Sequence, residues 1–101
     1  MIRGTTPTLT FTTPYEAKMV SSGFITFTMR GKVLFDIPIS DDSVVVEDYA
    51  VSLTLSQEQT LAFKPQYRVL VQVRLGLGSG EYVASNIIQI PIENVLRDGE
   101  I

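Results

Sequence analysis

The chain has 101 residues, the length of a single domain, and its composition is 45% hydrophobic and only 19% charged. This balance predicts a packed core and excludes intrinsic disorder. The formal net charge of −3 disfavours nucleic acid and anionic membranes as partners. The absence of cysteine and histidine excludes disulfides, zinc fingers and histidine-based catalytic triads. Apolar runs reach only three residues, so no membrane insertion is expected.

Apolar and polar residues alternate along most of the chain with a period of two, which is the pattern of half-buried β-strands. In chain order, strands are expected at residues 8–13, 23–30, 32–39, 44–46, 49–55, 68–75 and 88–92. The glycine-centred link at Gly31 predicts that the second and third of these form a β-hairpin. β-Branched and aromatic residues dominate these runs, as pleated, half-buried surfaces prefer.

Helical signals are confined to residues 56–61. Ser56 has the character of an N-cap, and Gln59 stands at the position that completes a capping box. Pro65 follows closely and prevents a long helix. We therefore expect one helical turn that links two strands.

About seven short strands separated by turns predict an all-β protein, an immunoglobulin-like antiparallel β-sandwich with one short helical turn. A closed barrel is the alternative architecture. We expect an N-terminal arm at residues 1–7, the sandwich domain at 8–93 and a C-terminal arm at 94–101. The predicted core consists of Phe11, Ile25, Phe27, Met29, Val33, Phe35, Ile37, Val51, Leu53, Leu55, Leu61, Val69, Val71, Val73, Ile88, Ile90 and Ile92.

Residues that could support catalysis or bind a cofactor are sparse. The acidic pairs at residues 41–42 and 47–48 offer oxygen ligands for calcium, but they lack a recognised ligand spacing and read better as a solvated turn and a strand end. The glycine-rich residues 76–80 fit a hairpin tip rather than a phosphate loop. Arg68 and Arg74 share a strand face and are expected to pair with acidic neighbours across the sheet, with a ligand-binding role as the alternative. We therefore predict a protein that is not an enzyme, with no catalytic residue, metal or cofactor.

Aliphatic residues outside the core pattern point to a partner interface. Leu34, Leu70 and Ile87 fall in the outward phase of their strands, so they either form a contact patch, lie on a covered second face or are shifted by a bulge. Both ends of the chain are either frayed or adhesive arms that pair with a neighbouring subunit. The candidate interface residues of the arms are Ile2, Arg3, Thr5, Thr6, Val95, Leu96 and Ile101.

Residues 3–11, which read Arg-Gly-Thr-Thr-Pro-Thr-Leu-Thr-Phe, resemble the opening of small structural proteins of tailed bacteriophages that infect Gram-positive bacteria. The order of elements is similar to the N-terminal domain of phage baseplate upper proteins. The hairpin at 23–39, the Val-x-Leu-Thr-Leu strand before a helical turn at 51–61 and the Tyr-x-Val-x-Val-x-Val strand at 67–73 carry the likeness.

The resemblance implies a non-enzymatic virion structural protein, assembled in the bacterial cytoplasm as an assembly or attachment module of the tail or baseplate. Its partners would be other phage structural proteins, further copies of itself, or both. A capsid-decoration or neck protein is one alternative. A carbohydrate- or cell-surface-binding module is another, although the chain has no tryptophan and its four tyrosines share no evident strand face.

Overall fold

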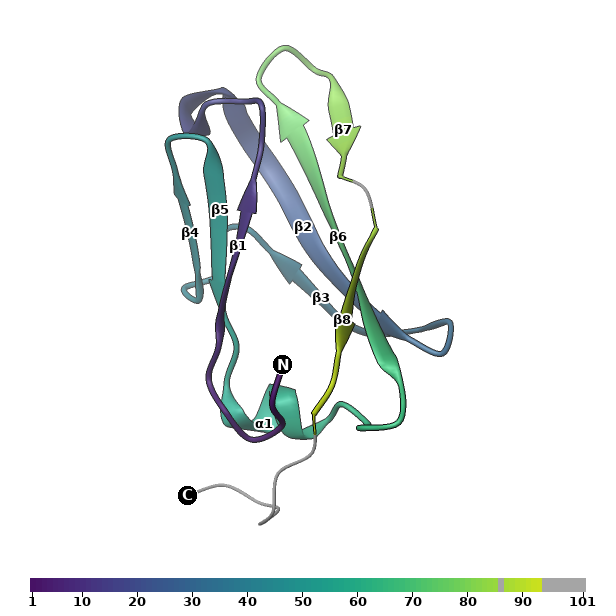
Figure 1. Cartoon of the computed structure of the whole chain (residues 1–101). Coiled ribbons are helices and arrows are strands. Elements are labelled where there is room, and N and C mark those ends of the chain that lie inside the picture. Colours follow the sequence, from purple (N-terminus) through teal and green to yellow (C-terminus); the bar gives the residue numbers. More distant parts are fainter. Residues whose placement is uncertain (86, 94–101) are drawn as a thin grey trace.

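The computed structural model describes residues 1–85 and 87–93. The strands are β1 (Thr8–Thr12), β2 (Val20–Met29), β3 (Lys32–Pro38), β4 (Val44–Glu47), β5 (Ala50–Thr54), β6 (Arg68–Leu77), β7 (Tyr82–Ala84) and β8 (Ile88–Pro91). A 3-10 turn, η1 (Ala17–Met19), precedes β2, and one short helix, α1 (Gln57–Leu61), lies between β5 and β6. Figure 1 shows α1 closing one end of the molecule between the two sheets.

The strands form two antiparallel sheets that face each other (Figure 1). One sheet has the order β1-β5-β4, and the other has β3-β2-β6 with β7 and β8 on the remaining edge of β6. Because β7 pairs with one half of β6 and β8 with the other half, they lie end to end and fill one strand position. The prediction of an antiparallel β-sandwich with about seven strand positions is confirmed, and no ladder in the described part of the chain closes it into a barrel.

The second strand occupies a distinctive place in this sandwich. In immunoglobulin constant domains the second strand belongs to the same sheet as the first and fifth strands. Here β2 lies between β3 and β6 in the larger sheet, and its ladders with these two strands run along most of its length. The likeness to immunoglobulin domains therefore lies in the two-layer antiparallel architecture, and the larger sheet gains a continuous broad face.

The predicted local signals are present at the hairpin and at the helix. Arg30 and Gly31 have φ angles of 55° and 77°, the left-handed pair that a two-residue hairpin turn between β2 and β3 requires. At α1 the backbone N–H of Gln59 donates to the Ser56 hydroxyl at 3.1 Å, and the Ser56 N–H donates to the Gln59 side chain at 2.8 Å. The predicted capping box is confirmed, and it sets the start of the helix.

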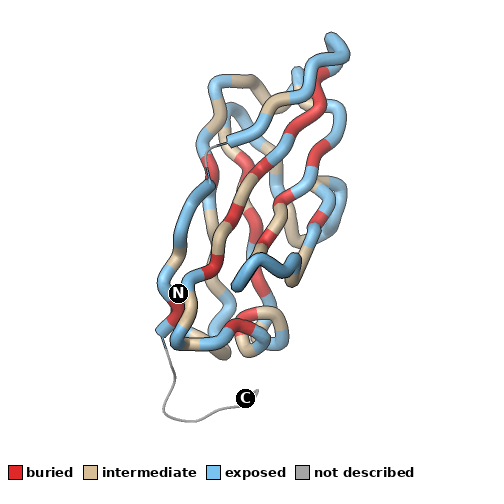
Figure 2. Tube along the Cα trace, turned by 90° about the vertical axis from the view of Figure 1, so that its right-hand side faces the viewer, coloured by how far each residue is buried: buried red, intermediate tan, exposed pale blue. Residues whose placement is uncertain are grey.

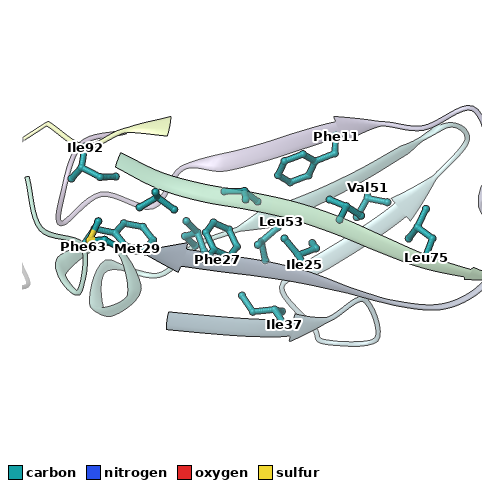
Figure 3. Packing of buried hydrophobic residues seen from close by; sticks show 14 residues of the cluster. Phe11, Ile25, Phe27, Met29, Ile37, Val51, Leu53, Phe63, Leu75 and Ile92 are labelled. Carbon is teal, nitrogen blue, oxygen red and sulfur yellow. The ribbon is translucent and has the colours of Figure 1, made fainter. Parts of the chain in front are cut away.

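The core lies between the sheets and contains most of the residues predicted for it (Figure 3). The buried residues of the prediction are Phe11, Ile25, Phe27, Met29, Ile37, Val51, Leu53, Leu55, Val69, Val71, Val73 and Ile92. Phe35, Leu61 and Ile90 are only partly buried. Figure 2 shows how buried and exposed residues alternate along the strands, which is why a period-two pattern identified the core.

Two predicted core positions are wrong. Val33 is 62% exposed because a β-bulge shifts the register of β3: Phe35 lies opposite Phe27, but Val33 lies opposite Thr28. The extra residue, Leu34, packs against the core instead. Ile88 is also exposed, since it lies at the first position of an edge strand, with no further strand beside it.

Three buried hydrophobic residues were not predicted: Phe63, Leu75 and Leu77. Phe63 follows α1 in a segment without strand alternation, yet its ring stacks on Phe27 with a centroid distance of 6.2 Å. It also meets the Phe35 ring edge-on at 5.7 Å. This aromatic cluster seals the end of the sandwich at which α1 lies.

The N-terminal arm lies against its own chain. The Met1 ammonium donates to the carbonyl oxygen of Pro91 at 2.8 Å, and the N–H of Glu93 donates back to the Met1 carbonyl at 2.7 Å. Arg3 N–H donates to the Glu93 carbonyl at 3.0 Å, so Ile2 and Glu93 form a short parallel bridge. Residues 94–101, the expected C-terminal arm, lie outside the described residues. Among the described residues, no helix is long and apolar enough to cross a membrane.

Candidate binding face on the larger sheet

The face of the larger sheet that points away from the core, called the outer face below, is a regular array of side chains. Its rows follow from the strand registers and from the inward position of the alternate residues. From one end to the other, the rows are Ser22, Gly76 and Tyr82; Pro38, Phe24, Arg74 and Ala84; Asp36, Thr26 and Gln72; and Val33, Thr28, Leu70 and Gln89. The four rows thus mix apolar, aromatic and a few charged groups.

Aliphatic side chains gather at one end of the outer face. Val33, Leu70 and Ile87 supply aliphatic side chains to a shallow groove of about 360 Å³ across β3, β2 and β6, called the aliphatic groove below. The polar and charged residues that line the same groove are Thr26, Thr28, Asp36, Gln72 and Arg74. Val33 and Ile87 are each at least 60% exposed, so their methyl groups face solvent. The bulge in β3 places Val33 here, because it turns this residue away from the core. Exposed aliphatic side chains that line one groove are typical of a contact surface.

Aromatic side chains mark the other end of the outer face. Phe24 and Tyr82 line a second depression of about 480 Å³, with Arg74 between their strands. Gly76 lies beneath Tyr82: a Cβ atom there would be 3.2 Å from the tyrosine ring. The ring therefore lies against bare backbone, and Tyr82 remains 85% exposed. A flat, wide and solvent-facing ring of this kind is a common anchor in binding surfaces.

The charges on the outer face are not paired as the sequence predicted. The cross-strand neighbours of Arg74 are Phe24 and Ala84, and no described residue forms a hydrogen bond or ion pair with its guanidinium. Arg68 donates to the neutral side chain of Gln89 at 3.3 Å. The expected pairing of these arginines with acidic neighbours is therefore wrong, since the strands beside β6 present no carboxylate at either register position.

The one carboxylate within the rows belongs to Asp36 on β3. The Thr26 hydroxyl donates to Asp36 Oδ1 at 2.7 Å, which fixes the carboxylate on the outer face. Asp36 and Arg74 stand one row apart with β2 between them, so they are separated within the sheet. The face thus carries one carboxylate, Asp36, and two arginines, of which Arg68 is hydrogen-bonded to Gln89 and Arg74 is available to a partner.

The outer face of the smaller sheet has a different character. The hydroxyls of Thr8 and Thr54 lie 2.9 Å apart, and those of Thr10 and Ser52 lie 3.0 Å apart. These pairs satisfy one another, and they make a polar surface suited to contact with water. Val45, on the edge strand β4, is the large aliphatic residue exposed on this sheet.

The structure brings two of the predicted interface residues together. Leu70 and Ile87 share the aliphatic groove. Leu34, predicted with them, is the bulged residue and lies elsewhere, beside Met29 and Ala62. Sequence reasoning missed Phe24 and Tyr82 on the outer face. The outward phase of Phe24 in residues 23–30 was a usable signal, whereas the position of Tyr82 depends on which strand lies beside β6.

The predicted residues of the N-terminal arm make contacts within the chain. The Arg3 guanidinium donates to the carbonyl oxygens of Phe63 at 2.7 Å and Leu61 at 2.9 Å, and so satisfies the end of α1. The Thr5 hydroxyl donates to the Ile2 carbonyl at 2.6 Å, and Thr6 is exposed beside α1. Val95, Leu96 and Ile101 lie outside the described residues, so the arm hypothesis for them stays a prediction.

Of the acidic residues weighed for calcium, Asp41 and Asp48 contribute to local structure. The Asp41 carboxylate accepts hydrogen bonds from the Ser43 hydroxyl at 2.6 Å and the Ser43 N–H at 3.0 Å, and these bonds lower its pKa. The Asp48 carbonyl accepts from the Ala17 N–H at 2.6 Å. In residues 1–85 and 87–93 no group of three or more acidic side chains is arranged to hold a metal ion.

No model of a known protein family matches this sequence, and a search of curated proteins finds no significant match. The geometry of the molecule defines an all-β sandwich with one polar outer face and one mixed aliphatic and aromatic outer face.

Proposed function

We propose that this chain is a non-enzymatic structural protein of a bacteriophage virion, an assembly or attachment module of the tail or baseplate that acts through protein–protein contacts. The observation that carries the protein-contact role is the outer face of the larger sheet, where Val33, Leu70, Ile87, Phe24 and Tyr82 are presented to solvent or half-buried. The phage context is supported by the resemblance of residues 3–11 and of the element order to baseplate upper proteins.

The energetics of the outer face favour a protein partner. Burying apolar surface yields about 25 cal/mol per Å², and the aliphatic groove and the aromatic depression offer this surface on one side of the molecule. Large aromatic side chains such as Tyr82 contribute disproportionately to protein interfaces. Thr26, Thr28 and Gln72 add uncharged polar groups to the lining of the groove, and a mixture of apolar and polar groups is typical of interfaces that form after folding.

A carbohydrate-binding module is the second candidate, and Tyr82 is the observation that favours it. Its exposed ring could stack on a sugar, with the neighbouring Arg74 supplying hydrogen bonds. The exposed aliphatic side chains of Val33 and Ile87 favour a protein partner instead, since they can form no hydrogen bond with a sugar. A capsid-decoration or neck protein would use the same face and differ only in its location within the particle.

The test is incorporation of an epitope-tagged chain into particles produced by the phage that encodes it. We expect the tag in virions purified by density gradient, and labelled electron microscopy should locate it on the tail. Leu70→Asp places a charge in the aliphatic groove and should abolish incorporation while the circular dichroism spectrum stays unchanged. The matched control is Val45→Asp, an exposed valine of the other sheet that should be incorporated normally.

Absence of the tagged wild-type chain from purified particles would overturn the virion assignment. If Leu70→Asp entered particles as efficiently as Val45→Asp, the role of the outer face would be overturned. Specific binding to a glycan array that Tyr82→Ala removes, without incorporation into particles, would select the carbohydrate-binding alternative.

A further inference from the structure

We infer that the partner of the outer face is a second copy of this chain, bound face to face about a two-fold axis, with Asp36 of each copy opposite Arg74 of the other. The inference rests on the proposed function, because it uses the same face. It adds the identity of the partner and the residues that fix the register.

The charges on the outer face are complementary to those of a second copy. Asp36 is held on the face by the Thr26 hydroxyl, and Arg74 has no hydrogen-bond or ion-pair partner among the described residues. In a two-fold interface, any contact from residue i to residue j is repeated from j to i. Asp36 and Arg74 of two copies can therefore form two ion pairs of opposite charge, while Arg68 keeps its hydrogen bond to Gln89.

The positions of these groups define where the axis runs. Neighbouring strands are about 4.8 Å apart, and successive rows on one face about 6.8 Å apart. Asp36 and Arg74 are two strands and one row apart, so the line that bisects their separation crosses β2 between the rows of Phe24 and Thr26. On this flat array the same line runs midway between Phe24 and Thr26 on β2 and midway between Gln72 and Leu70 on β6. Each of these four residues would therefore lie beside its own copy at the axis.

This arrangement places suitable chemistry at the centre of the interface. Phe24 and Leu70 supply apolar contact along the axis, and Thr26 and Gln72 beside them supply uncharged polar contact. Depletion of charge at the centre is characteristic of protein interfaces. Tyr82 and Ile87 lie toward the β7 and β8 edge, where each can cover the β3 side of the other copy.

The broad side of the molecule is large enough for a stable dimer. The described chain has principal dimensions of 47 × 27 × 17 Å, and the sheets lie in the two broad sides. A standard protein interface buries about 800 Å² on each partner, which one broad side of this slab can supply. Because a two-fold contact closes on itself, the assembly built through this face stops at a dimer.

The experiment is sedimentation velocity with charge-reversed variants at matched concentrations up to roughly 100 μM, where a micromolar dimer is well populated. Wild type should sediment as a dimer. Arg74→Glu and Asp36→Arg each place like charges opposite one another twice, and each should weaken association at least tenfold. The doubly substituted chain restores two opposite-charge pairs and should dimerise again.

A mixture of the two single variants makes the test specific for this register. Neither variant should dimerise alone, but the mixture should form a heterodimer in which both pairs are of opposite charge. Val45→Asp is the control for a charge on the other sheet and should leave the dimer unchanged. Circular dichroism of each variant shows whether it is folded; Leu70→Asp, which changes no ion pair, should also give a monomer.

A wild-type chain that remains monomeric at the highest concentration would overturn the inference, as would a dimer that the charge reversals do not affect. These outcomes are separable from failure of the proposed function. A monomer that still enters particles in a Leu70-dependent manner has a different protein as its partner, so the proposed function stands without the self-association. A chain that dimerises but never enters particles would overturn the proposed function and leave the self-association standing.

Discussion

The buried hydroxyl of Thr60 accepts a hydrogen bond from the backbone N–H of Gly4 at 2.9 Å, across 56 residues of sequence. The same hydroxyl lies 2.8 Å from the carbonyl oxygen of Thr5, to which it donates. Thr60 is fully buried and is the polar member of the buried set in the described chain. One side chain of α1 thereby fastens the N-terminal arm to the domain, and the Arg3 guanidinium adds a second attachment at the end of the same helix.

We expect Thr60→Val to destabilise the domain by about 1–3 kcal/mol. Valine preserves the shape of the side chain but leaves the Gly4 N–H and the Thr5 carbonyl without their partner. Urea denaturation followed by circular dichroism measures the change in free energy of unfolding. Thr60→Ser keeps the hydroxyl and should lower the free energy of unfolding by less than Thr60→Val does.

Thr54→Val is the matched control, because Thr54 is exposed and its hydroxyl bonds with the Thr8 hydroxyl at the surface. Its effect should stay within about 0.5 kcal/mol. If Thr60→Val and Thr54→Val were equally harmless, the buried hydroxyl would not hold the arm.

A pair of valines tests the assigned strand phases. Val71→Asp buries an unpaired charge at a fully buried position of β6 and should leave the chain unfolded. Val33→Asp introduces the same group on the solvent side of β3, so stability should change by no more than about 0.5 kcal/mol. Dispersion of the amide signals in an NMR spectrum distinguishes folded from unfolded chains. An unfolded Val33→Asp variant would contradict the bulge at Leu34.

The contrast between Val33 and Val71 also shows how far the sequence could predict the fold. The alternation of apolar and polar residues identified β2, β5 and β6. Each sheet buries one side and exposes the other, so these strands have a period-two pattern in their sequence. A bulge adds one residue without changing composition, and the phase of residues 32–39 was therefore wrong at Val33. Phe63 was missed for a related reason, since a loop residue that closes a core has no periodicity to reveal it.

The candidate site was predictable only where it depended on a single strand. The outward phase of Leu70 follows from its own strand, and its position opposite Thr28 shows that the phase was correct. The juxtaposition of Phe24, Arg74 and Tyr82 depends instead on which strands flank β6, which a single sequence does not encode locally. The contact of Arg3 with the end of α1 is likewise a long-range contact that no local sequence pattern predicts.

The close approach of β2 and β6 at Gly23 predicts a strict requirement for glycine. A Cβ atom at this position would lie 2.5 Å from the carbonyl oxygen of Arg74 and 2.9 Å from a methyl group of Leu75. The first of these is backbone in a paired strand and cannot move aside without disturbing the ladder. Gly23→Ala should therefore lower the free energy of unfolding by about 1–3 kcal/mol.

Gly78→Ala provides the comparison for this variant. The nearest heavy atom to a Cβ there is the Met19 carbonyl oxygen at 3.9 Å, an ordinary contact. Alanine at such a site restricts the unfolded chain and should be neutral or stabilising by up to about 1 kcal/mol. The midpoint temperatures of thermal unfolding of the two variants should shift from wild type in opposite directions or by clearly different amounts. Equal midpoint temperatures would show that β2 and β6 are farther apart at Gly23.

The turn before β4 predicts a pH dependence that arises from Asp41. The Ser43 hydroxyl and the Ser43 N–H both donate to its carboxylate, and they hold its pKa below the usual value of about 3.9. A carboxyl whose pKa is lower when folded contributes stability that is complete above its unfolded pKa and is lost as the pH falls through the folded pKa. The contribution of Asp41 to stability should therefore be constant above about pH 5 and be lost only in acid below about pH 4.

Titration of the Asp41 side-chain carbon by NMR should show a depressed pKa in wild type. Ser43→Ala removes the largest cause, so the pKa should move back toward its ordinary value while the fold is retained. A pKa of Asp41 at or above the ordinary value in the wild-type chain would mean that Ser43 does not donate to this carboxylate in solution.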